Sequence, residues 1–163
     1  NVLLLLVFQL LTAFGLQAQE TIRLGIIGLD TSHSEAFIKL INGENQAPDY
    51  VGFKIVAAYP YGSQTIESSY NRIPKYTETA KSHGIQITSS IAELLKQVDC
   101  VLLETNDGTL HPEQATEVIK SGKSLFIDKP VFPMFWQSTN WRKKNKCPYS
   151  PLRHYVSLHE IQN

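Results

Sequence analysis

Short apolar runs alternate with helical patterns along most of the chain. Four runs, at 22–28, 53–59, 98–104 and 124–127, are rich in apolar residues, and glycine, proline or polar turns follow them. Such runs are typical of strands that are buried on both faces of a parallel sheet. A shorter run at 85–88 predicts one more strand.

Helical patterns lie between these runs. The first begins with a capping box from Ser32 to Glu35. Its apolar face is expected to consist of Ala36, Phe37, Leu40 and Ile41. Further helices are expected at 77–83, at 90–96 after a second capping box, and at 111–120 with proline in the first turn. Strands and helices that alternate at this spacing predict an α/β fold, a doubly wound parallel sheet of the Rossmann-like kind.

The N-terminus has a different pattern. Residues 2–16 are strongly apolar and uncharged, and small polar residues follow at 17–19. This order is typical of a secretory signal with cleavage after Ala18. We therefore expect a signal peptide at 1–18 and export to the periplasm or the extracellular space, with no membrane contact after cleavage. The alternative is a retained anchor, although the stretch is shorter than the roughly 20 residues of a spanning helix.

Composition limits the function classes but names no activity. Fifteen Lys and Arg residues balance fifteen Asp and Glu residues. A chain without net charge has no long-range field that attracts nucleic acid, so no nucleic-acid partner is expected. Hydrophobic residues make up 42% of the chain, as in globular proteins. Two cysteines are too few for a disulfide framework or a four-cysteine zinc site.

Ligands of doubly wound sheets bind in a crevice at the carboxyl ends of the strands. The segment after the first predicted strand is an altered dinucleotide-binding glycine motif: Gly28 is present, but Asp30 and His33 replace two glycines. A carboxylate at position 30 would repel a pyrophosphate if its side chain faced the ligand. The following helix still offers N–H groups to an anion, and Thr31 and Ser32 add hydroxyl donors.

Two other strand ends carry candidate chemical groups. Lys129 lies between Asp128 and Pro130, where a rigid turn would hold its ammonium near the crevice to polarise a substrate oxygen or relay a proton. His111 is a second candidate acid or base. The alternatives are a solvated surface lysine and a histidine that caps the helix.

A metal site is not expected from the sequence. Asp30 and His33 are two potential ligands within one loop. Two ligands without a third do not make a metal site, so none is predicted.

Three segments, in this order, resemble the Gfo/Idh/MocA family, the relatives of glucose–fructose oxidoreductase and inositol dehydrogenase. Residues 23–29 resemble its opening strand and glycine turn. Residues 98–105, followed by His111, resemble its strand, polar turn and histidine-led helix. Residues 115–130 resemble the stretch that ends in Glu-Lys-Pro, with aspartate in place of the glutamate. The resemblance covers residues 22–131.

The resemblance implies an NAD(P)-binding Rossmann domain at 19–131 that acts with NAD or NADP on a hydroxyl of a sugar or cyclitol. It also implies Lys129 as the catalytic lysine, a second α/β domain that is missing here, and a homo-oligomer in intact relatives. Carried over by position, the residues at the cofactor are Gly28, Leu29, Asp30, Thr31, Ser32, His33, Thr105, Asn106, Asp107, Asp128 and Pro130.

The tail departs from the family pattern. Residues 132–141 contain proline and two tryptophans without a helical stripe, and residues 143–148 return to the pattern of a helix end entering a strand. We expect 132–163 to be an irregular tail that includes a shifted reading frame. Two alternatives to an oxidoreductase therefore stay open: a non-catalytic ligand-binding module and an inactive fragment.

Overall fold

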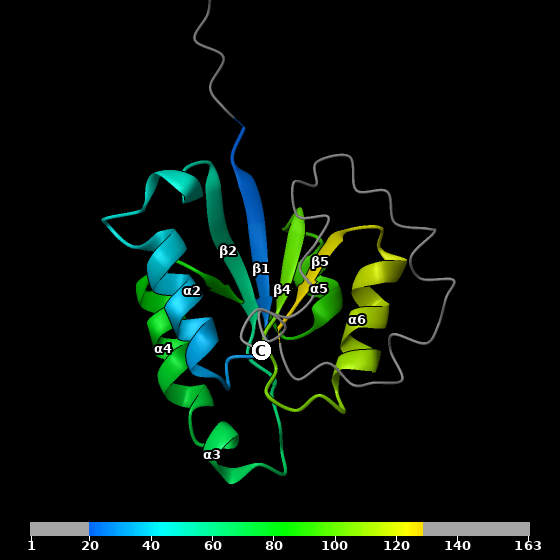
Figure 1. Ribbon diagram of the computed structural model, residues 1–163. Helices are drawn as coiled ribbons and strands as arrows, with labels where there is room; N and C mark the ends of the chain where they lie inside the picture. The colour runs from blue at the N-terminus through cyan, green and yellow to red at the C-terminus, as the bar shows by residue number, and fades with distance from the viewer. Residues whose placement is uncertain (1–19, 129–163) are drawn as a thin grey trace, which may run out of the picture.

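The computed structural model describes residues 20–128, which form one parallel sheet with helices on both faces (Figure 1). The strand order is β3-β2-β1-β4-β5, and each pair of neighbouring strands is parallel. The strands are β1 (Ile22–Ile27), β2 (Phe53–Tyr59), β3 (Gln86–Ile87), β4 (Cys100–Leu103) and β5 (Ser124–Ile127). The predicted doubly wound α/β fold is confirmed.

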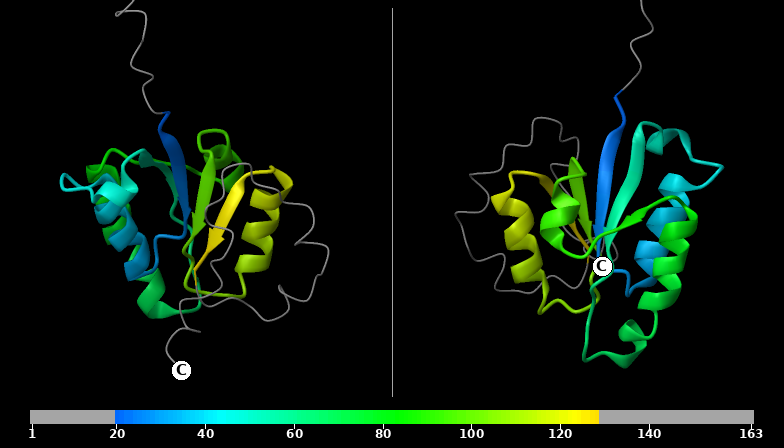
Figure 2. Two further views of the ribbon diagram at one scale, coloured as in Figure 1. Left: turned by 45° about the horizontal axis from the view of Figure 1, so that its top comes forward. Right: turned by 180° about the vertical axis from the view of Figure 1, so that it is seen from behind.

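The helices cover the sheet in two layers (Figure 2). Their bounds are α2 (Ser32–Asn42), α3 (Glu67–Tyr70), α4 (Ile73–Ser82), α5 (Ile91–Leu95) and α6 (His111–Lys120), and a 3-10 helix spans Pro48–Tyr50. On one face α2 and α4 pack on the sheet through Ile38 and Tyr76. On the other face α5 and α6 pack through Leu94 and Val118.

Strand β1 supplies both cores because its side chains alternate between the faces. Leu24 and Ile26 are buried under α2 and α4, whereas Ile27 is buried under α5 and α6. A Cβ at Gly25 would lie 2.7 Å from Leu94 Cδ2, so glycine at this position allows α5 to approach the sheet closely. Residues 24–27 of this central strand are therefore buried on both faces, as the apolar run predicts.

The first predicted helix exists, but two of its details were wrong. The N-cap is Thr31 and not Ser32, because the Ser34 N–H donates to Thr31 Oγ1 at 3.3 Å. The buried face consists of Ser34, Ile38 and Ile41, while Ala36 and Leu40 are exposed. The spacing of four and three residues between the buried positions is that of one helical face.

The other helices follow the sequence pattern with shifted ends. Helix α4 begins at Ile73, four residues before the predicted start at residue 77, with proline in its first turn. Helix α5 has Ser90 as its N-cap, as predicted, and Ser90 Oγ accepts from the Glu93 N–H at 3.2 Å. The bounds of α6 are those predicted.

Several expectations concern residues that the structure does not describe. The signal peptide at 1–18, Lys129, Pro130 and the tail at 132–163 lie outside the described residues. Between residues 20 and 128, none of the helices has the length and apolar character needed to cross a membrane.

Candidate functional site

The candidate site lies where the strand order reverses, between β1 and β4. From β1 the chain crosses to β2 and β3 on one side, and it later returns to β4 and β5 on the other. The carboxyl ends of these parallel strands meet at one edge, at the bottom of Figure 1. Open α/β sheets bind ligands in the crevice at such a switch point.

Gly28 is the first residue after β1, and its position requires glycine. Its φ is +92°, a conformation that side-chain-bearing residues rarely adopt. A Cβ there would lie 2.5 Å from the backbone N of Thr105. The Gly28 N–H donates to the Tyr59 carbonyl at 2.9 Å. The turn is thus pressed between the ends of β2 and β4, as the first glycine of a dinucleotide motif requires.

Asp30 does not face the crevice surface. Its side chain is fully buried and accepts from the Ser63 N–H at 3.0 Å and from the Asn106 N–H at 3.1 Å. Gly62 lies directly against this carboxylate, because a Cβ there would overlap with it. Burial raises the pKa of Asp30, while the two backbone donors oppose the rise. The carboxylate ties three loops together, so the repulsion of a pyrophosphate considered from the sequence has no basis in this geometry.

Replacing Asp30 by glycine is therefore expected to destabilise the fold and not to restore a dinucleotide motif. The variant leaves the N–H groups of Ser63 and Asn106 without their acceptor, which costs about 2 kcal/mol of unfolding free energy. Urea denaturation measures this loss. Asp49→Gly is the control, because Asp49 is exposed in the 3-10 helix. Equal losses in the two variants would contradict the bridging role.

The start of helix α2 presents donors to the crevice. Thr31 caps the helix, so its hydroxyl is engaged with the Ser34 N–H, and Ser34 Oγ donates to the Thr31 carbonyl at 2.7 Å. Ser32 and His33 follow in the first turn and are exposed. N–H groups of a first turn have no intrahelical acceptor, and the helix dipole favours an anion beside them. Leu29 is buried in the core, so its side chain is not available to a ligand.

The loop after β4 contains the other predicted cofactor residues. Thr105 is buried, and its Oγ1 has no hydrogen-bond partner among residues 20–128. Asn106 Nδ2 donates to Ser69 Oγ at 2.6 Å. Asp107 accepts from the Thr109 N–H at 3.0 Å, and its hydrogen bonds with Thr109 lower its pKa. Of these three predicted residues, Thr105 is the one whose polar side-chain atom lacks a partner among residues 20–128.

His111 lies beneath this loop and not on the crevice surface. Its side chain is 1% exposed, and its Nε2–H donates a hydrogen bond of 2.7 Å to the Thr105 carbonyl. Burial lowers the pKa of His111, which favours the neutral imidazole at neutral pH. Through this hydrogen bond the buried histidine stabilises the backbone of the loop at Thr105.

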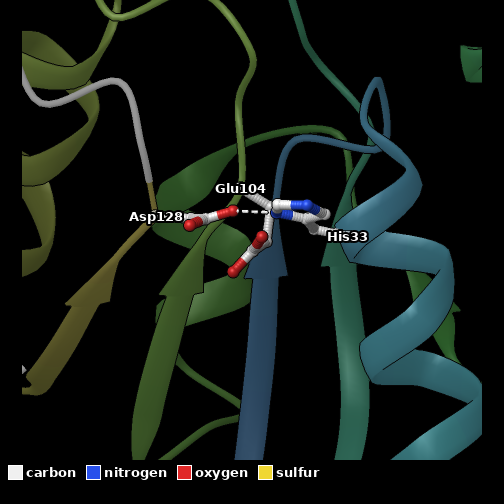
Figure 3. A group of neighbouring side chains, drawn as sticks. All are labelled: His33, Glu104 and Asp128. Atoms are coloured by element: carbon white, nitrogen blue, oxygen red, sulfur yellow. Dashed lines mark hydrogen bonds and ion pairs between the residues drawn. The ribbon is translucent and has the colours of Figure 1, made fainter. Parts of the chain in front are cut away.

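Three side chains meet across the switch point: His33, Glu104 and Asp128 (Figure 3). They come from the first turn of α2 and from the ends of β4 and β5. His33 Nδ1 pairs with the Asp128 carboxylate. Glu104 is 1% exposed, and burial, together with the negative charge of Asp128, raises its pKa to about 8. Glu104 was not among the predicted site residues; its signal in the sequence is a carboxylate directly after an apolar run.

A model of the Gfo/Idh/MocA oxidoreductase family, described as an NAD-binding Rossmann fold, matches residues 22–142. A search of curated proteins found no match.

Solved structures resemble the chain in fold. The dehydrogenase MviM from Clostridium difficile is 21% identical with a TM-score of 0.52, over 70% of this chain and 32% of that one. UDP-N-acetylglucosamine 3-dehydrogenase GnnA from Acidithiobacillus ferrooxidans is 19% identical with a TM-score of 0.47, over 68% and 29%. Of these two structures, MviM has the TM-score that shows a shared fold. The chain spans about a third of the length of these structures.

The described residues fit a bound dinucleotide at the turn after β1. Gly28 has the backbone conformation and the close approach to Thr105 that the motif needs. Asp30 is withdrawn into the loops, and the first turn of α2 is exposed beside the crevice. With the family match over 22–142, these features show that the chain belongs to the Gfo/Idh/MocA oxidoreductase family, of which it is the NAD-binding Rossmann domain.

Proposed function

We propose that this domain serves an exported oxidoreductase that acts on a hydroxyl group of a sugar or cyclitol. The binding of NAD is supported by the turn from Gly28 to the first residues of α2, which lies at the switch point of the sheet. The resemblance over residues 22–131 supports the substrate class. The apolar, uncharged residues 2–16 support export.

The chain's own residues would bind and orient the cofactor. The N–H groups of Ser32 and His33 are available to the pyrophosphate. Thr105 Oγ1, which is buried without a partner among the described residues, is a further donor next to Gly28. NAD, when bound, supplies hydride-transfer chemistry. We assign the proton of the substrate hydroxyl to Lys129 on the family resemblance.

Nucleotide binding is tested by titrating the full chain with NADH and, separately, with NADPH, followed by cofactor fluorescence. Circular dichroism first establishes that the chain is folded. The proposal expects saturable binding of NADH with a Kd on the order of micromolar, an ordinary affinity for a small ligand. A folded chain that binds neither nucleotide would contradict the proposal and favour the non-catalytic ligand-binding module.

The substrate class has a separate test. The full chain is mixed with NAD⁺ and a panel of sugars and cyclitols, with amino acids and simple alcohols as the comparison panel, and absorbance at the NADH band is followed. Reduction of NAD⁺ with members of the first panel alone is expected. Reduction with the comparison panel alone would contradict a sugar or cyclitol substrate.

Export is tested with residues 1–19 fused to a reporter enzyme that becomes active only outside the cytoplasm. The proposal expects reporter activity, and it expects that activity to disappear when Leu4 and Leu5 are replaced by arginine, which interrupts the apolar segment. A fusion protein that is produced but shows no reporter activity would contradict export.

A further inference from the structure

The group formed by His33, Glu104 and Asp128 offers three metal-ligating atoms from three separate segments. A ring nitrogen of His33 and one carboxylate oxygen each from Glu104 and Asp128 lie within 4.8 Å of one another. The segments are the first turn of α2 and the residues directly after the neighbouring strands β4 and β5. Figure 3 shows the three side chains next to one another, with the Glu104 carboxylate beside the contact between His33 and Asp128. The fold therefore converges these groups, although they are far apart in the sequence.

Glu104 gives independent reason to expect a ligand at this point. Its side chain is 1% exposed, and its carboxyl group lies against the Asp128 carboxylate, a hydrogen-bond contact that needs a proton on one of the two groups. No other group among residues 20–128 bonds to its two oxygens. Two carboxylates this close repel each other when both are ionised, and a buried carboxylate is costly to ionise without a counter-charge. No lysine or arginine among residues 20–128 forms an ion pair with the Glu104 carboxylate. A bound cation would satisfy both oxygens.

The donor set indicates which cation fits. Imidazole nitrogen suits zinc and other late transition metals, whereas Mg²⁺ and Ca²⁺ prefer sites made of oxygen ligands alone. Imidazole nitrogen and carboxylate oxygen are both ordinary ligands of Zn²⁺, and three protein ligands leave a position for water. The ion can enter from solvent, because the side chains of His33 and Asp128 are 47% and 20% exposed.

We propose that His33, Glu104 and Asp128 bind a Zn²⁺ ion at the switch point of the sheet. The site goes beyond the NAD-binding function and does not depend on it. It differs from the ligand pair weighed from the sequence, because Asp30 is fully buried and engaged with two backbone N–H groups. His33 stands where the dinucleotide motif has its last glycine, so this replacement supplies the imidazole.

The site is tested by isothermal titration calorimetry. The full chain is first freed of metal with a chelator and then titrated with Zn²⁺. The absorption spectrum of added Co²⁺ reports the ligand geometry. We expect one Zn²⁺ per chain and d–d bands of a low-coordinate Co²⁺ site. His33→Gln and Asp128→Asn are each expected to weaken Zn²⁺ binding at least tenfold. His83→Gln and Glu78→Gln are the matched controls, because both residues lie on or next to α4, away from the strand ends.

Two outcomes would overturn the proposal. A folded wild-type chain that does not bind Zn²⁺ would show that the two carboxyl groups are satisfied without a metal ion. Zn²⁺ binding that survives both His33→Gln and Asp128→Asn would place the ion elsewhere in the chain. Circular dichroism of each variant excludes unfolding as the cause of a loss. The NADH titration in the presence of chelator separates this result from the fate of the proposed function.

Discussion

Replacing Gly28 by alanine is expected to lower the free energy of unfolding by about 3 kcal/mol or more and to abolish NADH binding. Its φ of +92° is strained for any residue with a Cβ. That Cβ would also lie 2.5 Å from the Thr105 backbone N, and a backbone atom cannot move aside as a flexible side chain can. Urea denaturation and cofactor fluorescence measure the two effects.

The matched control for this variant is Gly122→Ala. Gly122 also has a positive φ, of +76°, but a Cβ there would meet no atom within 4 Å. It is therefore expected to cost only the backbone strain, about 1 kcal/mol, and to leave NADH affinity unchanged. Equal stability losses in the two variants would show that contact with Thr105 does not constrain the turn.

Glu104 is expected to make the metal-free protein less stable as the pH rises. Its pKa is raised from 4.5 to about 8 in the folded state, first by burial and then by the negative charge of Asp128. Between these two values the folded state binds more protons than the unfolded state, so stability falls with increasing pH. The contribution is fully present below about pH 4.5, declines by at most about 1.4 kcal/mol per pH unit, and is lost above pH 8.

Glu104→Gln is the variant that tests this dependence, because glutamine has nearly the same shape and does not ionise. Urea denaturation from pH 5 to 8.5, in the presence of chelator, is expected to show a decline for the wild-type chain that the variant lacks. Glu78→Gln is the control, since Glu78 is exposed beside Lys81 and should leave the decline in place. A wild-type stability that is constant or rises over this range would contradict a buried, uncompensated carboxyl group.

The strands were predictable because each one is a local pattern. The apolar runs at 53–59 and 124–127 became β2 and β5 with the same bounds, because strands covered on both faces must be apolar at nearly every position. Helix α6 was equally predictable, since proline in its first turn and Gly122 beyond its end are local signals. The switch point followed from the order of these elements.

The contacts within the candidate site could not be predicted in the same way. Asp30 was identified as a departure from the glycine motif, but its acceptor role depends on Ser63 and Asn106, which are 33 and 76 positions away. The pairing of His33 with Asp128 spans 95 positions. Such contacts depend on how the strand ends assemble, and no local pattern records them. Glu104 was overlooked because a carboxylate at a strand end gives no sign of its burial.

We expect the turn after β1 to hold NAD at the switch point of the sheet. The most direct test is an NMR titration of the isotope-labelled full chain with NADH, in which each backbone amide reports separately. We expect the largest shifts at the amides around the turn and the loop after β4: Gly28, Ser32, His33 and Thr105. A folded chain whose amide signals do not move, or move only at a distant element such as α4, would contradict it.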